Sequence, residues 1–114
     1  MSVKLSSRQV GDVNVMDVAG RITLGEGSSA LRDALRDMVS KSQKKILLNL
    51  AEVSYIDSSG IGELVSGFTT VTNSGGQLKL LNLTKRVKDL LQITKLYTIF
   101  EVEDDEPTAV NSFH

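Results

Sequence analysis

The sequence predicts a single α/β domain over residues 1–114, with a mixed, mostly parallel sheet of about four to five strands and helices packed mainly on one face. Three observations predict this fold. The length, 114 residues, is enough for one domain and not two. Short apolar runs of strand length alternate with longer segments whose apolar residues recur every three or four positions. After one hairpin, a helical segment separates each strand from the next, which is typical of parallel strands.

The chain is expected to start with a β-hairpin. Residues 3–10 alternate loosely, like an edge strand, and Gly11-Asp12 suits a tight turn. Residues 13–19 have apolar side chains on both faces, so we expect a central strand.

A glycine-spaced connection over residues 20–27 leads to the first helix. Ser28 or Ser29 is a plausible N-cap for a helix over residues 29–42. One side of that helix is apolar and carries Leu31, Leu35, Met38 and Val39.

The middle of the chain joins a buried strand to a second helix. Residues 46–50 form a near-continuous apolar run, as in a strand buried on both faces, and residues 51–56 are expected to form a short connection. Asp57-Ser58-Ser59-Gly60 then opens a helix that should end near residues 73–76. Its apolar stripe has helical spacing and consists of Ile61, Leu64, Val65, Phe68 and Val71.

The last third repeats this pattern with shorter elements. We expect a strand over residues 77–83, a short helix capped by Thr84 and a last strand over residues 96–102. An acidic connection over residues 101–106 leads to a terminal helix, Pro107 to His114, since proline fits the first helical turn.

Composition excludes several functions. The net charge is −1 with no basic stripe, so nucleic-acid binding lacks its usual electrostatic signature. No apolar run approaches the roughly 18 residues that span a bilayer, and the first residues lack an apolar signal core. Cysteine is absent, so there is no disulfide or thiolate site, and a cytoplasmic location is expected. No cofactor is expected, and the acidic run over residues 101–106 has too little histidine beside it for a metal site.

Two serines lie where the buried strand meets the second helix. The simplest interpretation is helix capping, which contributes about 0.5–2 kcal/mol. However, Asp57, Ser58 and Ser59 can all cap, and one cap is enough. Gly60 and Gly62 in the first turn each disfavour the helix by up to roughly 1 kcal/mol, so a neighbouring element or a partner must approach closely there. A spare hydroxyl at a helix N-terminus could accept a phosphate.

An enzymatic role for these serines is not expected. A nucleophile elbow needs glycine two residues before and two after the serine, and neither Ser58 nor Ser59 has this spacing. The single imidazole, His114, is at the C-terminus, and a serine without a base is a poor nucleophile. Gly25-Glu26-Gly27 matches no phosphate-loop pattern and is most simply a turn, which argues against nucleotide binding.

The segment from Asn49 through Ile56-Asp57-Ser58-Ser59-Gly60-Ile61-Gly62 resembles the signature of the STAS family, the sulphate-transporter and anti-sigma-factor-antagonist domains. The resemblance covers essentially the whole chain. It includes Gly20-Arg21-Ile22, Gly75-Gly76 and the segment Val87-Lys88-Asp89-Leu90-Leu91 with Leu96 beyond.

The resemblance implies a bacterial anti-sigma factor antagonist, a monomer that regulates transcription by partner switching. Its unmodified form binds an anti-sigma factor that is commonly a serine kinase, and this frees a sigma factor. The kinase phosphorylates the first serine of the motif, here Ser58, and a serine phosphatase reverses the reaction. The partner surface implied by the resemblance comprises Arg21, Thr23, Asp57, Ser58, Ser59, Gly60, Ile61 and Gly62.

The sequence departs from the family at Thr23. Antagonists often carry an acidic residue there, so Thr23 leaves the identity of the partner open. An alternative function is a non-catalytic STAS interaction subunit of a transport or sensory assembly, in which Ser58 is only a helix cap.

Overall fold

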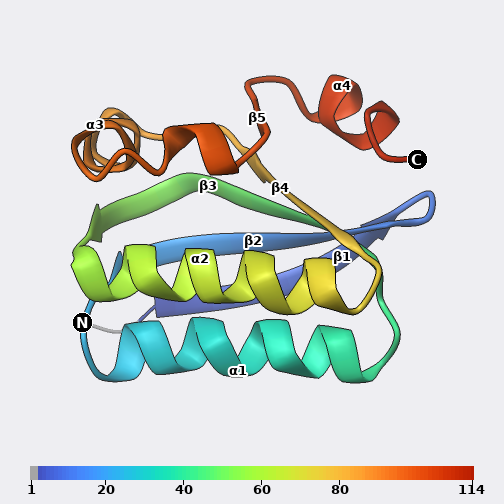
Figure 1. Cartoon of the computed structure of the whole chain (residues 1–114), viewed down its shortest axis with the longest axis horizontal. Coiled ribbons are helices and arrows are strands. Elements are labelled where there is room, and N and C mark those ends of the chain that lie inside the picture. The colour runs from blue at the N-terminus through green and yellow to red at the C-terminus, as the bar shows by residue number, and fades with distance from the viewer. Residues whose placement is uncertain (1–2) are drawn as a thin grey trace.

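The computed structural model describes residues 3–114 and has a five-stranded sheet in the order β1-β2-β3-β4-β5 (Figure 1). β1 is antiparallel to β2, and all later neighbours are parallel. The predicted mixed α/β sheet is thus confirmed. The strands are β1 Val3–Val10, β2 Val13–Ile22, β3 Lys45–Ile56, β4 Gln77–Leu81 and β5 Val102–Glu103.

Within residues 3–114, four α-helices cover the sheet. They are α1 Glu26–Ser40, α2 Ser58–Asn73, α3 Lys85–Ile93 and α4 Glu106–Asn111. The crossovers through α1, α2 and α3 all step in the same direction along the sheet, so right-handed connections place these helices on one face. They share one aliphatic core there, which includes Leu31, Leu64, Val87, Leu48 and Leu80. Figure 1 shows α1 and α2 running side by side.

The short helix α4 covers the opposite face. Ala109 and Phe113 pack against Val15, Leu47 and Leu81, which point away from the main core because side chains alternate along a strand. Buried Lys79 holds this C-terminal segment, since its Nζ donates 2.9 Å hydrogen bonds to the carbonyl and hydroxyl oxygens of Ser112 and pairs with Glu101.

The third strand is longer than the sequence predicted. Residues 51–56 were expected to form a connection, but they continue β3 to Ile56 and pair with the second half of β2. The register shifts twice along this pair, between Asp17 and Ala19 and between Gly20 and Arg21. These irregularities conceal the simple alternation by which a strand is recognised in sequence.

The first helix starts earlier than predicted, and neither Ser28 nor Ser29 is its N-cap. Gly25 occupies that position with φ of 97° and no side-chain cap. The reason is close packing against the end of β2, since a Cβ on Gly27 would lie 2.5 Å from the carbonyl oxygen of Arg21. Buried Ser28 instead donates its backbone N–H to the carbonyl of Thr23 at 2.9 Å.

The strand predicted over residues 96–102 is wrong for most of its length. Tyr97–Ile99 forms a 3-10 turn, and β5 comprises Val102–Glu103 alone. Phe100 is buried and meets Phe68 of α2 edge to face, with ring centroids 5.5 Å apart. Lys95 has a left-handed backbone with φ of 61° and the 3-10 turn follows it closely, so these residues do not run extended.

Candidate functional site at the start of helix α2

The serine motif lies at the carboxyl end of the parallel strands. β2 ends at Ile22 and β3 at Ile56, and α1, α2 and α3 start at this same end of the sheet, on the left in Figure 1. Ligand and partner sites in open α/β sheets gather at this end.

Asp57 is the N-cap of α2 and also ties two loops together. Its backbone is extended, with φ of −113° and ψ of −173°. One carboxylate oxygen accepts the Gly60 N–H at 3.0 Å, and the other accepts the Leu24 N–H at 3.1 Å. Its own N–H donates to the carbonyl of Ile22 at 3.3 Å. The carboxylate therefore holds the β2–α1 loop against the start of α2.

The hydrogen bonds to Asp57 keep its carboxylate ionised. Desolvation raises its pKa, but the backbone N–H groups of Gly60, Leu24 and Ser59 together outweigh desolvation and lower the pKa below its ordinary value. The turn therefore carries a fixed negative charge at neutral pH.

Ser58 is the first residue of α2, is exposed and does not cap the helix. Within residues 3–114 its hydroxyl makes no hydrogen bond, while Ser59 beside it is half-buried. The sequence left open which of three residues capped the helix, and the structure assigns that role to Asp57. Capping therefore does not explain Ser58.

The two glycines of the motif differ in their surroundings. A Cβ on buried Gly60 would collide with the carbonyl oxygen of Ile22 and lie 2.6 Å from Cγ1 of Ile56, so the fold itself requires glycine there. Gly62 is exposed, and a Cβ would meet nothing within 4 Å. Packing within the chain explains Gly60 and leaves Gly62 unexplained.

The remaining predicted contact residues divide between surface and interior. Arg21 is exposed near the end of β2, Thr23 is half-buried in the following loop, and Ile61 is buried in the core beneath the motif. Ile61 can support the surface but has only 2% of its area exposed to a partner.

Sequence reasoning missed two features at this end of the molecule. Leu24 is 80% exposed, although its backbone N–H is held by Asp57. The guanidinium carbons of Arg21 and Arg86 both lie over the Tyr55 ring, at 4.6 and 4.3 Å from its centre. The sequence could have indicated the exposure of Leu24, because an apolar residue there lies inside a glycine-spaced loop. It gave no indication of the contacts of Tyr55, because Arg86 is remote from it in sequence.

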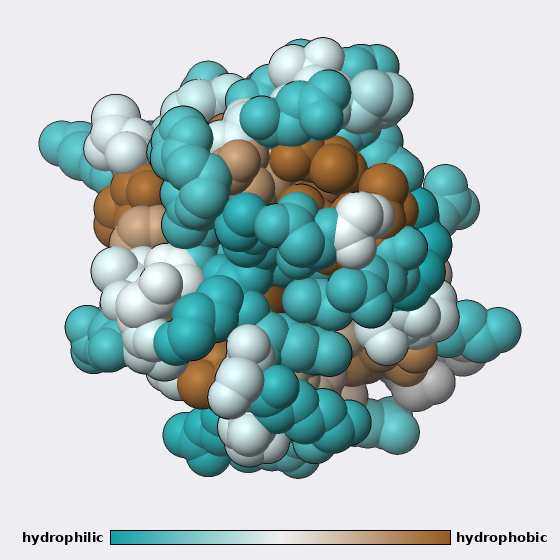
Figure 2. All heavy atoms as spheres, turned by 90° about the vertical axis from the view of Figure 1, so that its right-hand side faces the viewer, coloured by the Kyte–Doolittle hydropathy of each residue, from teal (hydrophilic) through white to brown (hydrophobic). Residues whose placement is uncertain are grey.

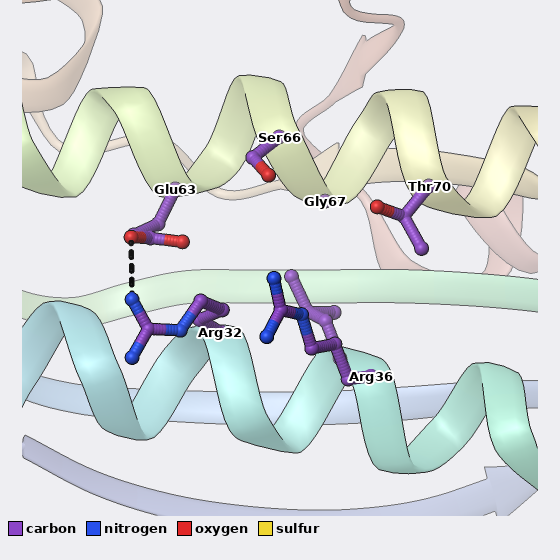
Figure 3. A pocket seen from close by; sticks show the side chains of 7 residues that line it. Arg32, Arg36, Glu63, Ser66, Gly67 and Thr70 are labelled. Carbon is purple, nitrogen blue, oxygen red and sulfur yellow. Dashed lines mark ion pairs between the residues drawn. The ribbon is translucent and has the colours of Figure 1, made fainter.

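A small hollow between α1 and α2 is distinct from the serine turn. Arg32 Nη1 and Glu63 Oε2 approach to 3.6 Å across it, as Figure 3 shows, and Arg36, Ser66 and Thr70 also line it. Its volume of about 10 Å³ has room for no more than about one water molecule. This hollow is therefore too small for a nucleotide.

The single imidazole lies at the opposite end of the sheet from Ser58. The backbone N–H of His114 donates to Gln77 Oε1 at 3.1 Å, and Gln77 is the first residue of β4. Hydrophilic side chains cover most of this end, which faces the viewer in Figure 2. Its broad hollow of about 340 Å³ is lined by Gln9, Asp12, Asn14, Ser42, Gln43, Lys44 and Lys45. His114 therefore cannot act as a base on Ser58 in this structure.

Residues 3–114 offer neither a cluster of metal ligands nor a membrane-spanning helix. This part of the chain contains no group of three or more His, Asp or Glu side chains suited to a metal ion. Among the same residues, no helix combines the length and the apolar character that crossing a bilayer requires.

The five-stranded mixed sheet, with an exposed serine that does not cap the helix at the start of α2, agrees with the predicted STAS fold. The STAS domain model matches residues 4–109, and the chain belongs to this family. A relative from Bacillus subtilis (strain 168), an anti-sigma-B factor antagonist, is 31% identical over 90% of this chain and 92% of its own length.

Solved structures show the same fold. The Thermotoga maritima protein TM1081 matches with a TM-score of 0.88 at 24% identity, over 96% of this chain and 93% of that one. SpoIIAA, an anti-sigma factor antagonist, is 18% identical and matches 95% of this chain in each of two structures. The unphosphorylated form matches over 96% of its own length with a TM-score of 0.71. The phosphorylated form matches over 97% of its own length with a TM-score of 0.74.

Proposed function

We propose that this protein is an anti-sigma factor antagonist whose binding is switched by phosphorylation of Ser58. The unphosphorylated form binds an anti-sigma factor and thereby frees a sigma factor. The observation that supports this best is the exposed Ser58 hydroxyl, which has no structural task because Asp57 caps the helix. The name of the Bacillus subtilis relative supports the same role.

The electrostatics of the turn support a switch that needs no change of fold. A phosphate adds about −1.5 to −2 charges at pH 7, and here it would adjoin the ionised Asp57 carboxylate. The N-terminus of α2 offsets part of this repulsion within the domain. A partner surface shaped around a neutral hydroxyl has no such compensation, so phosphorylation weakens binding. A loss of about 3 kcal/mol would lower affinity by roughly 10².

The likeness to both forms of SpoIIAA supports this mechanism. The two forms match this chain with similar TM-scores, 0.71 and 0.74, as expected if one fold accommodates both states. We assign the kinase role to the anti-sigma factor itself and removal of the phosphate to a serine phosphatase. We further propose that the antagonist is a cytoplasmic monomer, and that it is a binding protein and not an enzyme.

The contact surface in this proposal centres on the exposed part of the motif. Ser58, Gly62 and Arg21 meet the partner directly, and half-buried Asp57, Ser59 and Thr23 border that surface. Gly60 and Ile61 are buried and hold the turn in shape. Open space above Gly62 supports its assignment, since a partner can approach the helix backbone there.

Phosphorylation and binding can be tested together. The protein is incubated with ATP and the anti-sigma factor of its own organism, and the phosphate is mapped by mass spectrometry. Phosphate is expected on Ser58 and absent from the Ser58→Ala variant, whereas Ser66→Ala is the control because Ser66 is also exposed on α2. Ser58→Asp should bind the anti-sigma factor at least tenfold more weakly than Ser58→Ala. Equal affinities of the two variants would refute the switch and favour an interaction subunit of a larger assembly.

A further inference from the structure

Two arginines and one tyrosine form a stack beside the serine motif. The Arg21 guanidinium carbon lies 4.6 Å from the centre of the Tyr55 ring, and that of Arg86 lies 4.3 Å from it. Tyr55 is half-buried, and both arginines are exposed. Within residues 3–114, neither guanidinium group has a carboxylate or carbonyl partner.

The fold brings these three residues together from separate elements. Arg21 and Tyr55 are cross-strand partners in the β2–β3 pair. Arg86 is in the first turn of α3, where the Thr84 side chain accepts the Val87 N–H at 3.3 Å and fixes the start of that helix. Tyr55 precedes Ser58 by only three residues, so the stack and the motif share one end of the sheet.

Stacking on one ring orders two cations but leaves their hydrogen-bonding edges free. A guanidinium group over an aromatic face is attracted by the ring and still presents several N–H donors to solvent. Two ordered arginines lose less side-chain freedom on binding than two mobile ones. Such a pair suits planar carboxylates, which arginine binds with two parallel hydrogen bonds.

We infer that the Arg21–Tyr55–Arg86 stack is a docking site for acidic side chains of the partner protein. This inference rests on the proposed function, because it names the chemistry that the anti-sigma factor must present beside Ser58. The two arginines bind the carboxylates, and Tyr55 is a positioning residue.

The surroundings favour an acidic protein segment over a nucleic acid. Lys85, the next cation on α3, is already paired with Asp89 at 2.6 Å, and Asp57 and exposed Glu26 lie at the same end of the sheet. The whole chain has a net charge of −1. A polyphosphate backbone needs a continuous basic surface, whereas two or three carboxylates need only these two arginines.

The first experiment uses the protein with two probes and needs no partner. The arginine Nε–Hε signals are followed by NMR during titration with an acetylated, amidated peptide of six glutamates, and separately with a single-stranded oligonucleotide of six thymidines. The peptide should shift the Arg21 and Arg86 signals selectively and less so at higher salt, while Arg36, which is exposed on α1, stays unmoved. Tighter binding of the oligonucleotide, or no response of the two arginines to the peptide, would overturn the inference.

The second experiment measures affinity for the anti-sigma factor by calorimetry. Arg21→Ala and Arg86→Ala should each weaken binding by about fivefold, the upper end for an exposed charge pair, and the double variant should weaken it by about twenty-five-fold. Tyr55→Phe should leave affinity unchanged, and Tyr55→Leu should weaken it because the stack is lost. Arg36→Ala is the matched control.

The outcomes separate this inference from the proposed function. If the double variant binds like the unchanged protein while Ser58→Asp does not, the docking site is refuted and the switch stands. If the unchanged protein does not bind the anti-sigma factor, the proposed function fails, and the NMR titration still decides whether the stack recognises carboxylates. Melting temperatures of all variants show whether any loss of binding comes from unfolding.

Discussion

Replacing Asp57 with alanine should destabilise the fold by an amount that the structure allows us to estimate. The substitution removes an N-cap, which costs about 1 kcal/mol. It also removes the acceptor for the Leu24 N–H, and this bond to a charged group in a partly open site contributes about 1 kcal/mol more. The expected loss is therefore about 2 kcal/mol, or about 8 °C in melting temperature for a domain of this size.

Asparagine at the same position separates the two contributions. The Asp57 carboxylate accepts one N–H on each oxygen, whereas an amide has a single oxygen. Asp57→Asn should keep the cap to Gly60 and lose the tie to Leu24, so its loss should be about 1 kcal/mol. Asp33→Ala, an exposed acidic position on α1, is the control and should change stability by less than about 0.5 kcal/mol.

Urea unfolding followed by circular dichroism measures all three variants at pH 7. The expected order of stability is unchanged protein, Asp57→Asn, then Asp57→Ala, with similar dependence on urea concentration. A loss below about 0.5 kcal/mol for Asp57→Ala would refute the role of this carboxylate in joining the loop to α2.

Four other predictions follow from the same structure. Hydrogen bonds lower the folded-state pKa of Asp57, so its carboxylate stabilises the fold only while it is ionised. The stability difference between the unchanged protein and Asp57→Asn should therefore have its full value above the ordinary aspartate pKa of about 3.9 and shrink as pH falls below it. Urea titrations from pH 7 to pH 3 measure this difference. Gly60→Ala should destabilise the fold by about 1–3 kcal/mol through overpacking, whereas Gly62→Ala should stabilise it by about 0.5 kcal/mol and weaken partner binding. Urea unfolding should show stability changes of opposite sign for the two variants, and a calorimetric titration measures the weaker binding of Gly62→Ala. Leu24→Ser should leave the melting temperature unchanged because the side chain is 80% exposed, but should weaken anti-sigma factor binding about tenfold, and unchanged affinity would exclude Leu24 from the interface. Lys79→Met should keep the buried stem and lose the bonds to Ser112, so hydrogen exchange at Ala109 should accelerate about tenfold relative to α2.

The sequence predicted those parts of the fold that depend on local periodicity. Strand alternation, the stripe of Ile61, Leu64 and Val71, and the Thr84 cap all arise from residues within a few positions of one another, and the structure confirms them. The end of β3 depends instead on pairing with β2, about 33 residues away, and the register shifts there leave no local pattern. The start of α1 depends on how closely Gly27 approaches the carbonyl of Arg21, which composition does not reveal.

The candidate site shows the same division between local and distant causes. Asp57, Ser58 and Ser59 have equivalent capping chemistry, so their types alone left the cap open. The choice depends partly on Leu24, whose N–H reaches the second oxygen of Asp57 from a loop 33 residues earlier. Tyr55 likewise gains its role only when α3 brings Arg86 to its ring. Sequence reasoning could therefore locate the site and not assign the task of each residue.

Ser58 is available for regulation because Asp57, and not Ser58, caps the start of α2. A hydroxyl that caps its helix cannot be modified without weakening the fold, because phosphorylation would change the capping bond. Here Asp57 and Gly60 hold the turn, and the Ser58 hydroxyl contributes no hydrogen bond to it within residues 3–114. A phosphate on Ser58 would therefore act mainly on the surface that a partner meets, so affinity can change by orders of magnitude while stability changes little.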